Sequence, residues 1–247
     1  EGLTKLAWPD PAVDQPKAKR DYDSVELAFT KNLSNRWYFR GSYMWSRLYG
    51  NYSGLSQSDE NGRTDPNSGR SFDYPLMSFD GKAKPVFGVL ATDRTHQVKA
   101  QFIYQMPWGT SVGLNEYIAS GLPVTREVAV IPGSNFPMMY LGRGSDGRMP
   151  MYSRTDLSVQ HAFKFAGSRQ LHLELNVDNV LNQRVAVAKF STLNRPGEAV
   201  GFSETAFYLG QVDVSNLVGT LKPDARFLKD LDFQGGRSAR VGVRFLF

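Results

Sequence analysis

Seven segments of the chain alternate between apolar and polar residues, the pattern of β-strands with one apolar face. They are residues 22–31, 36–47, 95–106, 110–120, 154–164, 169–179 and 237–247. Each is close to the ~9–11 residues of a tilted strand that crosses a bilayer, whereas strands of soluble proteins more often have ~5–6. In the fourth segment Glu116 interrupts the apolar face, which predicts a bulge or a position near the rim.

The connections between these segments alternate strictly between short and long. The short ones are 32–35, 107–109 and 165–168, and the long ones are about 48–94, 121–153 and 180–236. Long connections are uncommon in compact soluble domains. Short periplasmic turns and long extracellular loops are typical of outer-membrane barrels. The sequence therefore predicts an all-β fold, an antiparallel transmembrane β-barrel segment, over residues 21–247, with residues 1–20 as an extracellular loop segment.

The odd number of predicted strands bears on whether this chain can close a barrel by itself. With periplasmic short turns, the first strand runs inward and the seventh ends at Phe247 in the periplasm. Single-chain bacterial barrels have even strand numbers. An open sheet in lipid leaves unpaired backbone groups that cost several kcal/mol each. We therefore expect further strands upstream or on a partner chain, and Glu1 in place of Met suggests a processed chain or a piece of a longer one.

The last eight residues end the chain on an apolar strand with an aromatic carboxy terminus. They match the barrel-assembly signal of outer-membrane proteins at Arg240, Gly242, Phe245 and Phe247. The match implies the bilayer and the barrel-assembly machinery as partners.

Aromatic residues lie near the ends of the expected strands. They are Trp37, Tyr43, Trp45, Tyr104 and Trp108, with Phe163 as a further member. Cross-strand packing in a soluble sheet is one interpretation. Their position favours aromatic girdles at the two membrane interfaces.

Composition narrows the function classes. The net charge of +5 is dispersed, without a basic block beyond 17–20, so nucleic-acid binding is not expected. The chain has no cysteine, which excludes disulfides and thiolate metal sites. The mean hydropathy of -0.38 fits a barrel as well as a soluble protein, because half of the strand residues of a barrel face water.

Several stretches resemble the end of a TonB-dependent receptor barrel, in particular the Oar-like group with a carboxypeptidase-regulatory-like amino-terminal domain. They are residues 24–31, 35–37, 42–46, 93–97, 106–109, 119–124, 154–159 and 175–182. In the last of these, LNVDNVLN is similar to the family segment in which a strand ends in an asparagine-rich turn, with Val180 and Leu181 in place of Leu-Phe. The resemblance covers roughly residues 21–247.

The resemblance implies a barrel of about 22 strands with a plugged lumen, of which this chain supplies about a third. It also implies TonB and an unknown extracellular substrate as partners, with a plug and TonB-contacting segment outside this sequence. The expected function is uptake by an outer-membrane receptor, without enzymatic activity. An outer-membrane structural or adhesion barrel without active transport stays open as the alternative, and a soluble secreted β-sandwich is a third.

No catalytic, cofactor or metal residues are predicted. Residues 58–73 contain spaced Asp and Asn but lack the spacing of an EF-hand, so a solvated loop is the main interpretation and calcium the lesser one. His96, His161 and His172 are dispersed, and 142–147 is interpreted as a flexible loop tip. Residues 228–233 could form a short amphipathic turn.

Overall fold

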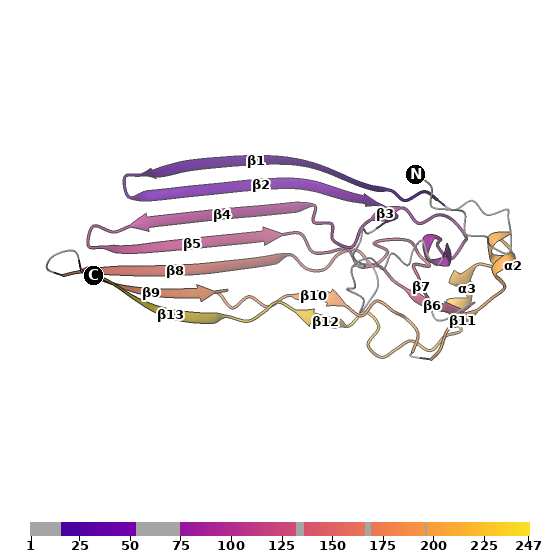
Figure 1. Cartoon of the computed structure of the whole chain (residues 1–247). Helices are drawn as coiled ribbons and strands as arrows, with labels where there is room; N and C mark the ends of the chain where they lie inside the picture. The colour runs from indigo at the N-terminus through magenta and orange to yellow at the C-terminus, as the bar shows by residue number, and fades with distance from the viewer. Residues whose placement is uncertain (1–15, 53–74, 132–135, 166–168, 196) are drawn as a thin grey trace.

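The computed structural model describes residues 16–52, 75–131, 136–165, 169–195 and 197–247. Its main feature is a long antiparallel sheet of seven strands in chain order (Figure 1). These are β1 (Arg20–Ser34), β2 (Trp37–Gly50), β4 (His96–Gln105), β5 (Thr110–Ala119), β8 (Tyr152–Lys164), β9 (Gln170–Asp178) and β13 (Ser238–Leu246). The short β3 (Gly88–Val89) pairs with the outer end of β2. The predicted antiparallel sheet of seven long strands is confirmed.

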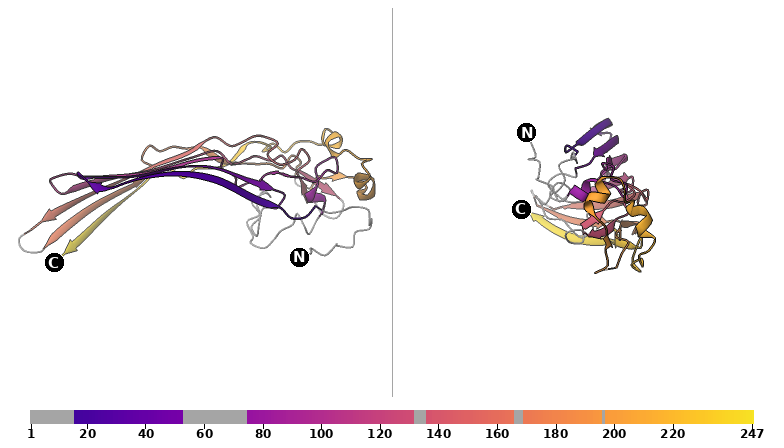
Figure 2. Two further views of the ribbon diagram at one scale, coloured as in Figure 1. Left: turned by 90° about the horizontal axis from the view of Figure 1, so that it is seen from above. Right: turned by 90° about the vertical axis from the view of Figure 1, so that its right-hand side faces the viewer.

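The register of the strands aligns their apolar residues in rows. Phe102 pairs with Leu114, Leu114 with Leu157, and Leu157 with Val177. Such cross-strand pairs stabilise a sheet, and a slip of one residue would move all of them to the other face. The sheet is curved along its length, as Figure 2 shows. Among the described residues, β1 pairs only with β2 and β13 only with β9, so both outer edges of the sheet are free.

Two short turns explain the tight pairing at one end of the sheet. Asn35 and Arg36 between β1 and β2 both have positive φ, 51° and 69°, as the two-residue turns of twisted hairpins require. This turn is tighter than the predicted 32–35 connection, because β1 continues to Ser34. Gly109 has φ 88° in the turn between β4 and β5, a conformation that favours glycine. Residues 166–168 of the third predicted turn lie outside the described residues.

The three long connections build a folded unit at the other end of the sheet, which we call the cap. It contains η1 (Pro75–Ser78), β6 (Val128–Ile131), β7 (Phe136–Met138), β10 (Ala186–Lys189), β11 (Val200–Gly201), α2 (Glu204–Tyr208), α3 (Val214–Val218) and β12 (Asp230–Phe233). Figure 1 shows these elements gathered beyond the outer ends of the strands. In the sidedness predicted from the sequence, the cap is the extracellular part.

The cap has a hydrophobic core to which all three connections contribute. It includes Leu76 and Phe79 from the first, Val128, Val130, Met138 and Tyr140 from the second, and Leu193, Val200, Phe207, Val214 and Val218 from the third. Helices α2 and α3 start at side-chain caps, since Ser203 accepts from the Ala206 amide and Asp213 from the Ser215 amide. The described parts of the long loops expected from the sequence therefore form a packed unit.

The prediction of a short amphipathic turn at 228–233 is wrong for residues 230–233. A turn ends at Leu228, which has φ 58°, and residues 230–233 form strand β12 paired with β10. The alternation of Asp230, Leu231, Asp232 and Phe233 fits a strand, and the partner β10 lies more than forty residues upstream, beyond the reach of a local pattern.

Candidate functional site

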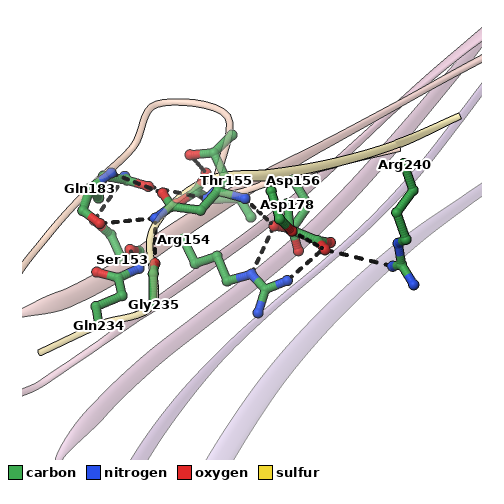
Figure 3. A network of polar contacts seen from close by, with 12 residues as sticks. Ser153, Arg154, Thr155, Asp156, Asp178, Gln183, Gln234, Gly235 and Arg240 are labelled. Carbon is green, nitrogen blue, oxygen red and sulfur yellow. Dashed lines mark hydrogen bonds and ion pairs between the residues drawn. The ribbon is translucent and has the colours of Figure 1, made fainter. Parts of the chain in front are cut away.

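The polar face of the sheet carries an ion-pair network at its outer half. On β8 and β9, the Arg154 guanidinium bridges two carboxylates, with Nε 2.8 Å from Asp156 Oδ1 and Nη2 3.2 Å from Asp178 Oδ1. From β13, Arg240 Nη2 lies 3.6 Å from Asp178 Oδ2 and Ser238 Oγ donates to the same oxygen at 3.1 Å. Figure 3 shows the side chains of Arg154 and Arg240 reaching Asp178 from two sides. The network joins the last three strands of the sheet.

A second ion pair on the same face lies nearer the periplasmic end. Arg244 Nη2 on β13 is 3.4 Å from Glu174 Oε1 on β9. Next to it, His172 contacts Gln160 at 2.7 Å and Gln170 at 3.1 Å. Polar side chains of the wall therefore satisfy one another, as a water-facing barrel interior allows.

A shallow, open depression of about 310 Å³ lies on the sheet beside the network. Its lining includes Gln101, Asn115, Asp156, Ser158, Asn176 and Arg240, contributed by β4, β5, β8, β9 and β13. These groups offer both hydrogen-bond donors and acceptors and two opposite charges. The arrangement suits contact with a polar partner and contains no nucleophile–base pair.

Beyond the strand ends, amide side chains attach the return segments of the cap to the wall. Asn179 follows β9 with φ 52°, and its Nδ2 donates to the carbonyls of Gln183 and Gly235. Gln183 donates to Ser153 Oγ at 3.0 Å, and Gln234 donates to the Ser153 carbonyl at 2.8 Å (Figure 3). The asparagine-rich turn that the family resemblance implies is therefore present after Asp178.

Glu116 lies on the apolar face without a bulge. The register of β5 against β4 and β8 is continuous through it, so of the two predicted alternatives, a bulge or a position near the rim, the bulge is wrong. The carboxylate is tolerated because Thr155 Oγ1 on β8 donates to it at 2.6 Å. Glu116 lies three residues before the outer end of β5, in the outer part of the strand.

Three of the five predicted girdle residues, Trp37, Tyr104 and Trp108, lie at a strand end or in a turn. Tyr43 and Trp45 lie in the middle of β2, where Tyr43 hydrogen-bonds His96 Nδ1 at 2.8 Å. Trp37 pairs with Tyr104 at the periplasmic end, and Trp108 in the next turn is 65% exposed. Their role as membrane girdles stays a prediction.

The predicted assembly signal forms the exposed end of β13. Arg240, Gly242 and Phe245 lie in the strand and Phe247 follows it. The rings of Phe245 and Phe247 stack with centroids 6.3 Å apart. Recognition of these residues by assembly machinery stays a prediction.

The three histidines lie on β4, β8 and β9, and each is hydrogen-bonded to a neighbour. His161 and His172 are one register position apart on the paired strands β8 and β9, on opposite faces of the sheet. His96 and His172 have the partners described above, and His161 Nδ1 lies 2.7 Å from Thr110 Oγ1. Within the described part of the chain, no group of three His, Cys, Asp or Glu side chains could hold a metal. The whole of the 58–73 loop considered for calcium lies outside the described residues.

The glycine-rich segment 142–147 is a hydrogen-bonded turn. Val124 exchanges backbone hydrogen bonds with Asp146 and Gly147, and Arg126 pairs with the Asp146 carboxylate. The hydrogen bonds that Arg126 donates to the Asp146 carboxylate raise the pKa of the guanidinium above its usual range. Residues 124–126 thus contact this turn from the other side of the same connection, and its flexibility stays a prediction.

Sequence reasoning missed the clamp between the first two long connections. The Asp93 carboxylate is buried, accepts from the Leu48 amide at 2.6 Å, and pairs with Arg148. Arg148 also donates to the Gly121 carbonyl at 3.1 Å. Asp93 stands in one of the family-like stretches, but nothing local to it indicates Arg148, 55 residues further along the chain.

The fold and its two faces define the class of protein. A family model described as "Outer membrane beta barrel domain" matches residues 8–136, slightly more than half of the chain. The chain therefore belongs to the outer-membrane β-barrel domain family, and its location is the outer membrane. This is a family of membrane barrels and not of enzymes.

One relative of the chain has a name that states its function. The chain is 28% identical, over 251 residues, to "TonB-dependent transporter Oar" of Myxococcus xanthus. The match covers 94% of this chain and 23% of the relative, so the chain spans about a quarter of that protein. No solved structure matches. Among the described residues, no helix is long and apolar enough to cross a membrane.

Proposed function

We propose that this chain forms part of the wall and outer mouth of a TonB-dependent outer-membrane transporter that takes up a substrate from outside the cell. The relative named as a TonB-dependent transporter is similar over 94% of the chain. The observation that carries the proposal is a wall with an apolar face and an opposite face of networked charges, topped by a packed cap.

The two faces and the cap have separate tasks in this proposal. The apolar rows contact lipid, and Asp156, Asp178 and Arg240 offer polar contacts to a plug and to a passing substrate. The cap restricts entry at the extracellular mouth. The plug, the remaining strands and the segment that contacts TonB belong to the rest of the transporter.

Energised uptake distinguishes transport from a structural or adhesive role. Cells with the complete gene, a deletion strain and the complemented strain are grown in defined medium, and depletion of solutes is followed by mass spectrometry. We expect at least one solute class to be taken up only when the gene is present, with uptake abolished by a protonophore. Identical depletion in all strains, together with altered surface attachment of the deletion strain, would support the adhesion alternative.

A further inference from the structure

Strands β12 and β13 share one continuous free edge. On their paired side, β12 lies against β10 and β13 against β9 (Figure 1). The short link between them continues that pairing, because the Gln234 amide donates to the Val185 carbonyl at 2.9 Å and the Arg237 amide to Asn182 Oδ1 at 3.1 Å. On the opposite side, neither strand has a partner within the described residues.

The β12 part of this edge lies outside the membrane. The nine residues of β13 span roughly 30 Å at about 3.4 Å per residue, which with the tilt of barrel strands covers most of the hydrocarbon core. All four residues of β12 are exposed, including Leu231 at 44% and Phe233 at 61%. A free strand edge with exposed apolar side chains is prone to pair with another strand.

We propose that the strand that closes the barrel against β13 continues beyond the membrane, adds to β12, and covers Leu231 and Phe233. A barrel wall in lipid leaves no open edge, so β13 must be paired. Because β12 prolongs the same edge, the partner of β13 reaches β12 by simple extension. The ladder that closes the barrel then continues from the membrane into the cap.

The direction of the strands identifies the occupant as an outward-running strand of the same barrel from outside residues 1–247. Six antiparallel ladders separate β1 from β13, so these two edge strands run in the same direction. The β1 strand of a second copy would meet β13 in parallel, whereas every ladder of the main sheet is antiparallel. The length of the relative, about four times that of the match, leaves ample chain for such a strand.

Cysteine labelling tests the covering of β12, because residues 1–247 contain no cysteine. Leu231→Cys and Phe233→Cys are introduced singly into the complete receptor in intact cells and treated with a membrane-impermeant maleimide. Leu209→Cys, at the end of α2 and 59% exposed, is the control. We expect both β12 positions to react at least tenfold more slowly than the control, and to react at the control's rate after unfolding in urea. Equal rates in the folded receptor would overturn the proposal.

Photo-crosslinking identifies what covers the edge. A benzophenone amino acid replaces Phe233 in the complete receptor, and the adduct is mapped by mass spectrometry. We expect an intramolecular crosslink to the outer end of the strand that neighbours β13. A crosslink to a second copy, to another protein or to lipid would overturn the proposal while leaving the transport function untouched.

Discussion

Arg148, on the second long connection, pairs with the buried carboxylate of Asp93, on the first. The same guanidinium donates to the Asp93 carbonyl at 3.2 Å and to the Gly121 carbonyl at 3.1 Å. Asp93 lies just before β4 and Gly121 just after β5, so one side chain ties the cap to the outer ends of two neighbouring strands.

Removal of this guanidinium is expected to loosen the cap. In Arg148→Ala the Asp93 carboxylate, with a side chain only 1% exposed, loses its counter-charge, which costs about 3–5 kcal/mol for a buried pair. The measurement is the rate of limited proteolysis within residues 121–233 of the complete receptor, which we expect to rise at least a hundredfold. The matched control is Lys82→Ala, which breaks an exposed pair with Asp213 at 3.9 Å and should change the rate little. Equal rates in the two variants would contradict the clamp.

The acid sensitivity of the cap is expected to depend on Asp224. Hydrogen bonds from the Arg226 side chain lower the pKa of Asp224 to about 2. A lowered carboxyl pKa stabilises the fold fully above the unfolded value near 4 and loses that effect as the pH falls toward 2. In Asp224→Asn the rate of pepsin cleavage in the cap should therefore vary less between pH 4 and pH 2 than in the wild type.

The pKa of Glu204 is shifted in the direction opposite to that of Asp224. Burial raises the pKa of its carboxyl, so its ionised form is the destabilising one and acid relieves it. Glu204→Gln should slow proteolysis of the cap at neutral pH, where Asp224→Asn accelerates it. If both substitutions change the proteolysis rate at neutral pH in the same direction, the opposite effects assigned to the ionised forms of Glu204 and Asp224 are contradicted.

The pairing of β13 is expected to respond to charge reversal. Arg244→Glu places a second carboxylate beside Glu174, and the double variant Glu174→Arg with Arg244→Glu restores an opposite-charge pair. Each exposed pair contributes about 0.2–1 kcal/mol, so the single reversal should lower the urea midpoint of the barrel slightly and the double variant should recover it. Additive losses in the double variant would show that the two groups do not interact.

The wall could be predicted from the sequence because its determinants are local. The alternation of Leu171, Leu173 and Leu175 reports the apolar face directly, and short turns fix the pairing of neighbouring strands. The sequence predicts the end of β1 at residue 31, whereas the strand continues to Ser34. Asn32 and Ser34 are typical turn residues, yet they extend the strand up to the Asn35–Arg36 turn. The paired neighbours then determine the polar network, since Asp178 and Arg240 fall on the same face.

The cap could not be predicted in the same way. Leu76, Val130 and Phe207 come from three different connections. Its contacts are set by packing between distant residues, which a local pattern does not encode. The same holds for the pairing of Asp93 with Arg148, because nothing in the sequence near either residue indicates the other.

A cavity at Phe207 tests whether the three connections fold as one unit. Phe207 on α2 is fully buried, and its ring lies 5.2 Å from those of Phe202 and Tyr208. Phe207→Ala should cost about 3–5 kcal/mol of cap stability, since the cavity cannot be refilled by the short surrounding elements. The control Leu209→Ala removes an exposed side chain two residues later and should be close to neutral.

Hydrogen exchange measured across the whole receptor distinguishes one cooperative cap from three connections that fold independently. If the cap is one cooperative unit, Phe207→Ala accelerates exchange in all three connections together, including β6 and the segment around Leu76, while the strands of the wall keep their protection. Acceleration confined to the connection that carries Phe207 would mean that the three connections fold independently. In that case the shared core would not hold the extracellular mouth as a single body.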